Sequence, residues 1–226
     1  MKGWVAGPQL RDDLAEPTGN VVAVRATSVN NVDRFTDGVL GHDFAGVTED
    51  GAEVFGFVWG GAWAERISAG DFVAPKPKSL SMAEAGAAPV AGLFALVYVE
   101  SLGLRAGESV LILGANGGAG SFAVQLCAAA GATVIAPGLA IDEAFLKGLG
   151  ASAVVPRGER PETDHVIDFV TPAPGIRAAS GSMARLAEVI DAHSIRVPIC
   201  EAFNFGEVPD ALAAFGDHKQ GKLSIM

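Results

Sequence analysis

The sequence predicts an α/β protein made of a compact β-rich part followed by a part with a parallel sheet. Residues 1–78 contain short strand-like runs separated by glycine turns, a pattern typical of a small β-barrel. Beyond residue 80, helix-forming and strand-forming segments alternate, which indicates a parallel sheet. A length of 226 residues suits one large or two modest domains.

In the β-rich part, strands are expected where β-branched and aromatic residues cluster between turns. Turns are predicted at Asp37-Gly38 and Asp50-Gly51, because Asp-Gly favours tight reversals. The expected strands cover residues 21–29, 54–61, 62–67 and 71–74.

The second part is expected to begin with a helix at Ser81. Ser81 and Glu84 form a capping box, in which each side chain bonds a backbone N–H at the helix start. Pro89 is expected to interrupt this helix, and a second one to span about 92–102. Further helices are predicted at 141–150, 182–192 and 207–215, strands at 153–155, 165–170 and 222–225, an extended segment at 195–205 and a loop at 171–181.

The most informative motif is the glycine-rich turn Gly114–Gly120. An apolar strand, 109–113, precedes it, a helix rich in small apolar residues follows at 121–130, and a second strand comes at 132–136. Strand, glycine turn, helix and strand in this order form the βαβ unit that binds a dinucleotide pyrophosphate. The motif reads Ala115-x-Gly-x-x-Gly rather than Gly-x-Gly-x-x-Gly, so a glycine-rich connection without a ligand stays open as the alternative.

Composition narrows the possible partners and the compartment. A net charge of −10 and the absence of a Lys/Arg-rich run argue against nucleic-acid binding. No apolar stretch is long enough to span a membrane, and the N-terminus lacks a signal-peptide core. The two isolated cysteines, Cys127 and Cys200, form no disulfide scaffold, so we expect a cytoplasmic protein.

Several segments in order resemble the zinc-independent quinone oxidoreductase branch of the medium-chain dehydrogenase/reductase superfamily. The resemblance rests on residues 20–33, Gly41-His42-Asp43-Phe44-Ala45-Gly46, the glycine turn, 196–199 and Gly221-Lys222-Leu223. It implies a GroES-like catalytic domain over residues 1–80, to which 195–226 partly return, and a Rossmann-type domain over 81–194. It also implies NADPH-dependent reduction of quinones or α,β-unsaturated carbonyls, a small-molecule substrate and a homodimer.

The resemblance carries over residue by residue to the expected sites. Asn30 stands where zinc alcohol dehydrogenases have a cysteine ligand, so no metal is expected. Asn30 is the expected amide donor to a substrate carbonyl, and Asp33 a candidate acid, although capping hydrogen bonds are the alternative for Asp33 and Asp43. The expected cofactor-binding residues are Ala115, Asn116, Gly117, Gly118, Ala119, Gly120, Ser121 and Pro137.

Cofactor choice is expected to be decided at the end of the second strand of the βαβ unit. NAD-preferring sites place Asp or Glu there, whereas this chain has no carboxylate before Asp142. This favours NADP, although no Arg or Lys follows directly and Lys147 lies in the next helix.

The chain is markedly shorter than members of the family it resembles. Residues 156–163 leave no room for a crossover helix, and a helix and at least two strands are missing between Phe169 and Ser182. Phe94 replaces the usual Thr. The shortening fits either a contracted or engineered form, or a sequence that joins segments whose intervening loops are missing.

Three functions are compatible with this sequence: a zinc-free reductase, a nucleotide-binding protein without turnover, and a purely structural scaffold. The aromatic residues of 55–63 are expected either to line a substrate site or to pack in the core.

Overall fold

A computed structural model describes residues 1–171 and 181–226, in two compact units. Unit 1 comprises residues 1–90, 179–218 and 222–226, of which 179 and 180 are not described, and unit 2 comprises 91–178 and 219–221. The loop predicted at 171–181 falls almost entirely outside the described residues.

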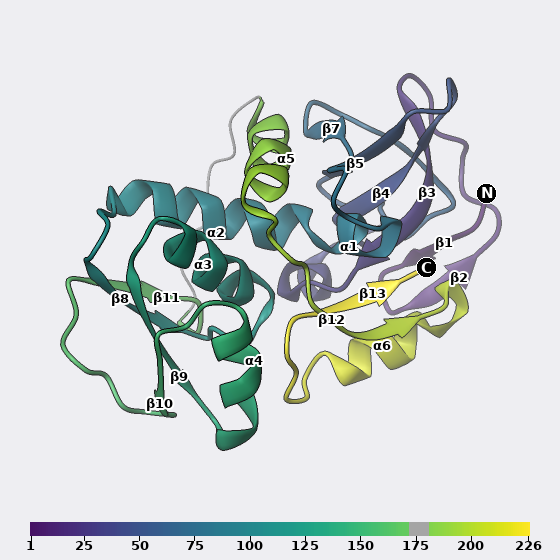
Figure 1. Cartoon of the computed structure of the whole chain (residues 1–226). Coiled ribbons are helices and arrows are strands. Elements are labelled where there is room, and N and C mark those ends of the chain that lie inside the picture. The colour runs from purple at the N-terminus through teal and green to yellow at the C-terminus, as the bar shows by residue number, and fades with distance from the viewer. Residues whose placement is uncertain (172–180) are drawn as a thin grey trace. The chain divides into compact units, whose positions relative to one another are not determined.

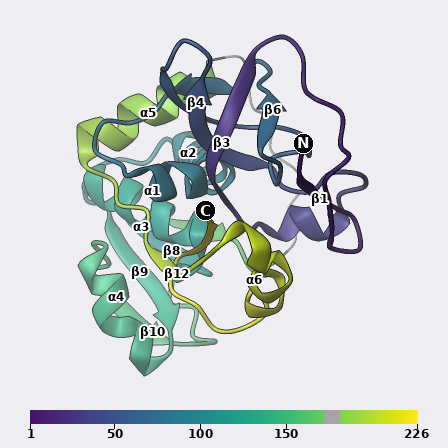
Figure 2. The same cartoon turned by 90° about the vertical axis from the view of Figure 1, so that its right-hand side faces the viewer.

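Unit 1 is built on a seven-stranded, mostly antiparallel sheet. Along it the order is β12-β13-β3-β4-β5-β7, and β6 pairs with β3. Figure 2 shows β3 and β4 side by side, in the register Val22 with Thr48 through Ala26 with Ala45. The strands are β3 (Val21–Ser28), β4 (Asp43–Thr48), β5 (Glu53–Phe57), β6 (Arg66–Ser68), β7 (Val73–Pro75), β12 (Ile199–Phe203) and β13 (Lys222–Ile225), and a separate ribbon joins β1 (Gly3–Val5) to β2 (Gln9–Arg11).

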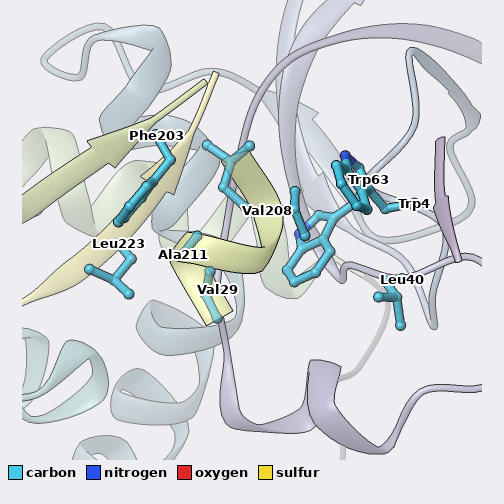
Figure 3. Packing of buried hydrophobic residues seen from close by; sticks show 9 residues of the cluster. Trp4, Val29, Leu40, Trp63, Phe203, Val208, Ala211 and Leu223 are labelled. Carbon is cyan, nitrogen blue, oxygen red and sulfur yellow. The ribbon is translucent and has the colours of Figure 1, made fainter. Parts of the chain in front are cut away.

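The core of unit 1 combines the two ends of the chain. Trp4 and Trp63 pack with residues contributed by β12, α6 (Val208–Ala214) and β13 (Figure 3). Both indole N–H groups are satisfied: Trp4 Nε1 donates to the Phe205 carbonyl at 2.7 Å and Trp63 Nε1 to the Ser28 carbonyl at 3.2 Å. The N-terminal strands therefore depend on the C-terminal segment for much of their buried apolar surface.

The helices follow the sequence closely, with one difference. The capping box at Ser81 and Glu84 is confirmed at the start of α1 (Met82–Ala87). Pro89 begins α2 (Pro89–Leu102) instead of only interrupting its predecessor, because the first turn of a helix needs no N–H from proline. The helix predicted at 182–192 is confirmed as α5 (Ser182–His193), and its apolar residues at helical spacing, Met183, Leu186, Val189 and Ile190, are buried.

Unit 2 holds a four-stranded parallel sheet of order β10-β9-β8-β11. Figure 1 shows α3 and α4 of the same unit next to these strands. The elements are β8 (Ser109–Leu113), α3 (Gly118–Ala129), β9 (Thr133–Gly138), η2 (Ala140–Asp142), α4 (Glu143–Gly148), β10 (Ala153–Pro156) and β11 (His165–Asp168). The chain passes from β10 to β11 without a helix, as the short connection predicts.

Two short 3-10 helices complete unit 1, η1 (Asn31–Phe35) and η3 (Phe205–Glu207). Within the described part of the chain, every helix is too short or too polar to cross a bilayer.

Candidate functional site

The glycine turn connects β8 to α3, and three of its glycines have distinct roles. Gly114 takes the positive φ of +76° that the reversal needs, so Ala115 is tolerated at the next position and is fully buried. A Cβ on Gly120 would lie 2.1 Å from the Gly114 carbonyl oxygen, so only glycine lets α3 pack this closely on the turn. Gly117 is the N-cap of α3.

The turn is lightly packed at Gly117. A Cβ built there would have a single neighbour within 4 Å, the Gly114 carbonyl oxygen at an ordinary contact distance of 3.4 Å. The N–H groups of Gly118, Ala119 and Gly120 stand at the positive end of a 12-residue helix, whereas the Ser121 N–H already donates to the Gly117 carbonyl at 2.9 Å. This arrangement fits a pyrophosphate, and any dinucleotide held here would approach the backbone directly.

A segment near the C-terminus is tied to this turn. The Gly221 N–H donates to the Asn116 carbonyl at 2.8 Å, and Asn116 Nδ2 donates to the Lys219 carbonyl at 3.1 Å. Asn116 therefore has a structural role in holding residues 219–221. Ser121 donates its hydroxyl to the Gly118 carbonyl at 2.8 Å, and Pro137 lies buried on β9, in register with Val155.

Unit 1 contains a buried polar network around Asn30. Lys222 Nζ donates to Asn30 Oδ1 at 2.6 Å, and Asn30 Nδ2 donates to Asp43 Oδ2 at 2.7 Å. The same Asp43 oxygen lies 3.4 Å from Lys222 Nζ and accepts the Ser28 hydroxyl at 2.6 Å. Its other oxygen accepts the Val90 N–H at 2.7 Å, in the first turn of α2. The charged pair is fully desolvated and hydrogen-bonded, which is what a buried carboxylate requires.

Asp33 lies beside this network and makes the hydrogen bonds of a capping residue. Its Oδ2 accepts the Asn30 N–H at 2.6 Å, closing a capping box on η1, and its Oδ1 lies 2.5 Å from His42 Nδ1. Burial raises the pKa of Asp33 above its ordinary value, and the hydrogen bonds from His42 and Asn30 partly oppose that rise. The structure therefore brings Asn30, Asp33, His42 and Asp43 together, with both oxygens of Asp33 already in use.

Lys222 is a functional candidate to which the sequence alone assigned no role. It is only 4% exposed although it lies in the apolar strand Lys222-Leu223-Ser224-Ile225. A lysine in such a strand needs a buried partner, and this requirement could have pointed to Lys222 from the sequence.

The aromatic residues of 55–63 divide into two groups. Phe55 and Trp63 are fully buried core residues, whereas Trp59 is 75% exposed. Trp59 contacts the edge of Phe57, with ring centroids 5.3 Å apart. Trp59 is thus the member of this segment that an external ligand could contact.

A second aromatic group lies in unit 2. Phe94, which replaces the family's Thr, packs against Tyr98 and Phe169 with centroid distances of 5.2 and 5.9 Å. A Cβ on Gly114 would lie 3.4 Å from Phe169 Cβ, so this group borders the start of the glycine turn. Between β8 and β11 the strand order reverses, and this is where open α/β sheets bind ligands.

Sequence comparison finds relatives among reductases. The chain is 32% identical over 158 residues to 2-methylene-furan-3-one reductase of Solanum lycopersicum, covering 56% of this chain and 39% of that protein. It is 34% identical over 128 residues to the chloroplast envelope quinone oxidoreductase homolog of Arabidopsis thaliana, covering 53% of this chain and 35% of the relative. The match thus spans well under two thirds of the curated relatives. No protein-family model matches the chain.

Structure comparison finds the same fold over the full chain. The quinone oxidoreductase of Coxiella burnetii superposes with a TM-score of 0.84 at 22% identity, covering 99% of this chain and 98% of that one. The quinone oxidoreductase of Thermus thermophilus, also solved with NADPH, gives a TM-score of 0.78 at 24% identity, covering 100% and 99%. The likeness extends over nearly the whole of both chains.

Fold and glycine turn together define the two-part architecture of a GroES-like domain joined to a Rossmann-type domain, as the sequence predicts. Within that class, the relatives and structural neighbours are quinone oxidoreductases and members of the medium-chain dehydrogenase/reductase superfamily, so the predicted resemblance is confirmed.

Proposed function

We propose that this protein is an NADPH-dependent oxidoreductase that reduces quinones or α,β-unsaturated carbonyls without zinc. The observation that carries the proposal is the glycine turn. Its backbone is lightly packed at Gly117, and Gly120 lets α3 pack closely on the turn. The names of the tomato and Arabidopsis relatives support the substrate class.

The proposed chemistry adds a hydride to the β carbon of an enone, and the resulting enolate takes a proton from solvent. Bound NADPH would supply the hydride and be oxidised to NADP⁺. The chain's own task is binding and orientation: the N–H groups of Gly118–Gly120 would hold the pyrophosphate, with Gly117 and Ser121 on either side of them. Ala115 and Ala119 would shape the turn and Pro137 would close the adenosine side.

Asn30 is the proposed donor to the substrate carbonyl. Its amide oxygen and one side-chain N–H are committed to Lys222 and Asp43, which leaves the second Nδ2 hydrogen as the donor. A donor fixed by buried partners stabilises developing enolate charge without reorganising. In this proposal Asp33 positions the Asn30 backbone and His42.

The zinc-free reading rests on the chemistry of the donor set. Where a thiolate would bind zinc, Asn30 carries an amide whose oxygen accepts the Lys222 ammonium. Bringing a dication to this position would place it against a buried cation. Among the described residues, no three His, Cys, Asp or Glu side chains are grouped to hold a metal.

We further propose a homodimer acting on a small molecule in the cytoplasm. Cys127 and Cys200 are not joined in a disulfide, which suits a reducing compartment. The alternative is a nucleotide-binding protein without turnover, because residues of the sheet that hold the nicotinamide in the family are missing from this chain.

The proposal is tested by titrating NADPH and NADH while following nicotinamide fluorescence, then adding a simple quinone or enone and following absorbance at the nicotinamide band. Binding with oxidation supports the reductase, whereas binding without oxidation of either acceptor supports the nucleotide-binding alternative. Binding of neither nucleotide overturns both functions.

A variant locates the site. Gly117→Leu adds a bulky side chain at the lightly packed turn and should abolish nucleotide binding while the chain stays folded. Gly206→Leu is the control, because a Cβ there meets open space but lies in η3 of unit 1. Equal affinity in Gly117→Leu and the control would show that the nucleotide binds elsewhere.

A further inference from the structure

The carboxyl end of β9 lies in register with the carboxyl end of β10. Val155 pairs with Pro137 and Pro156 with Gly138, so Arg157 and Leu139 each follow the last pair at the same end of the sheet. In Rossmann-type sheets, the group after the second strand selects the cofactor by contacting the ribose 2′-hydroxyl or 2′-phosphate. Parallel pairing therefore brings Arg157 to that place, although it lies 18 residues beyond Leu139.

A defined turn holds Arg157 at this end of the sheet. The Glu159 N–H donates to the Pro156 carbonyl at 3.0 Å, and Gly158 takes a φ of +102°. A positive φ at the third position is the signature of a type II turn, with Arg157 at its second position. Arg157 is exposed, so its guanidinium is accessible to a ligand.

Asp142 is the acidic residue that could contact the ribose at this end of the sheet, but its carboxylate already accepts hydrogen bonds from the protein. Asp142 is fully buried; its Oδ2 accepts the Leu139 N–H at 3.0 Å and its Oδ1 accepts Gln220 Nε2 at 3.1 Å. A carboxylate with both oxygens used by the protein is not positioned to take two ribose hydroxyls, as NAD selection requires.

Lys147 is the basic residue that the sequence suggested for the 2′-phosphate, but its ammonium lies at the other end of the sheet. Lys147 Nζ donates to the carbonyl of Ser152, the residue just before β10. Ser152 also donates its N–H to the Val134 carbonyl near the start of β9. The amino ends of the strands are remote from a ligand bound at their carboxyl ends, so Lys147 cannot contact the 2′-phosphate there.

We propose that Arg157 binds the 2′-phosphate of NADP(H) and is the cofactor-specificity residue of this chain. The assignment rests on the proposed function. Guanidinium and phosphate match in charge and in bidentate geometry, so the contact discriminates NADPH from NADH.

The test measures binding, which does not depend on turnover. Wild type, Arg157→Gln, Arg157→Lys and Arg160→Gln are titrated with NADPH and NADH by nicotinamide fluorescence, and with adenosine 2′,5′-bisphosphate and ADP by calorimetry. Arg160→Gln is the matched control: it removes the same charge from the same connection, at a residue whose charge acts on Asp168 of β11.

Arg157→Gln should weaken NADPH and bisphosphate binding about tenfold or more, the loss expected for one charge-assisted contact, while NADH and ADP change less than about twofold. The NADPH affinity of Arg157→Lys should lie between those of wild type and Arg157→Gln, because lysine keeps the charge but lacks the bidentate geometry of the guanidinium. Raising salt should reduce the NADPH advantage in wild type and not in Arg157→Gln.

Each proposal can fail separately. If wild type prefers NADPH and Arg157→Gln keeps that preference, or if Arg160→Gln loses as much, the Arg157 assignment is wrong while the proposed function stands. If wild type binds neither nucleotide, both proposals are overturned. A wild type that binds NADPH no better than NADH overturns the Arg157 assignment and the choice of cofactor.

Discussion

Lys222 and Asn30 meet in the interior of unit 1, 192 residues apart in sequence, through a 2.6 Å hydrogen bond from Nζ to Oδ1. Lys222 also lies 3.4 Å from Asp43, whose side chain is fully buried. One ammonium group therefore orients the candidate substrate-binding amide and compensates the charge of the carboxylate on its other side.

Removing that ammonium should strongly destabilise the protein. Lys222→Met leaves Asp43 as an uncompensated buried charge, and breaking such a pair costs about 3–5 kcal/mol. Chemical unfolding should show this loss, and Lys78→Met, at an exposed lysine, should stay within about 0.5 kcal/mol of wild type. Adding Asp43→Asn to Lys222→Met should recover part of the loss, because the charge is then gone; purely additive losses would contradict the pairing.

Two glycines with the same backbone angle should respond differently to alanine. Gly41 and Gly51 both have a φ of +87°, so each alanine pays a similar backbone cost of about 1–2 kcal/mol. A Cβ on Gly41 would also lie 2.1 Å from Trp63 Cδ1, whereas Gly51 has no atom within 4 Å. Gly41→Ala should thus lose a further 1–3 kcal/mol or so from overpacking. Equal losses of unfolding free energy in the two variants, measured by thermal or urea unfolding, would show that the Trp63 side chain moves aside without cost.

The two thiols should differ sharply in reactivity. Burial raises the pKa of Cys127 to about 12, and its side chain is inaccessible, whereas Cys200 is exposed. An aromatic disulfide reagent at pH 8 should therefore titrate one thiol in the native protein and two in denaturant, because the thiolate is the reactive form. Cys200→Ser should react slowly, at the rate of unfolding; rapid reaction of that variant would contradict the burial of Cys127.

Asp33 should make stability fall as pH rises in the acidic range. The pKa of Asp33 in the folded protein is raised above its ordinary value of 3.8, chiefly by burial. The folded state therefore holds the proton more tightly, so the contribution is complete below pH 3.8 and is lost as pH rises through the folded pKa.

This pH dependence is measured as the difference in unfolding free energy between wild type and Asp33→Asn across a pH series. The unfolding free energy of wild type minus that of Asp33→Asn should fall as pH rises. The same difference taken with the exposed control Asp37→Asn should show no such trend. A difference that grows with pH would mean that the hydrogen bonds from His42 and Asn30 outweigh burial.

The sequence by itself determined the local structure of this protein. The capping box at Ser81 and the strand–glycine turn–helix order around Gly114 were readable, because each depends on residues within a few positions of one another. The burial stripe of α5 followed from helical periodicity in the same way. Even the replacement of a glycine by Ala115 was harmless for a local reason, since Gly114 takes the positive φ.

Only the tertiary structure decided which distant residues share a site. Lys222 looked like one residue of an apolar terminal strand until pairing of β13 with β3 brought it to Asn30. Arg157 looked like a loop residue until the register of β9 with β10 placed it at the same end of the sheet as Leu139. Sheet register and the burial of a charge depend on contacts between segments far apart in the chain, and local propensity carries no information about those contacts.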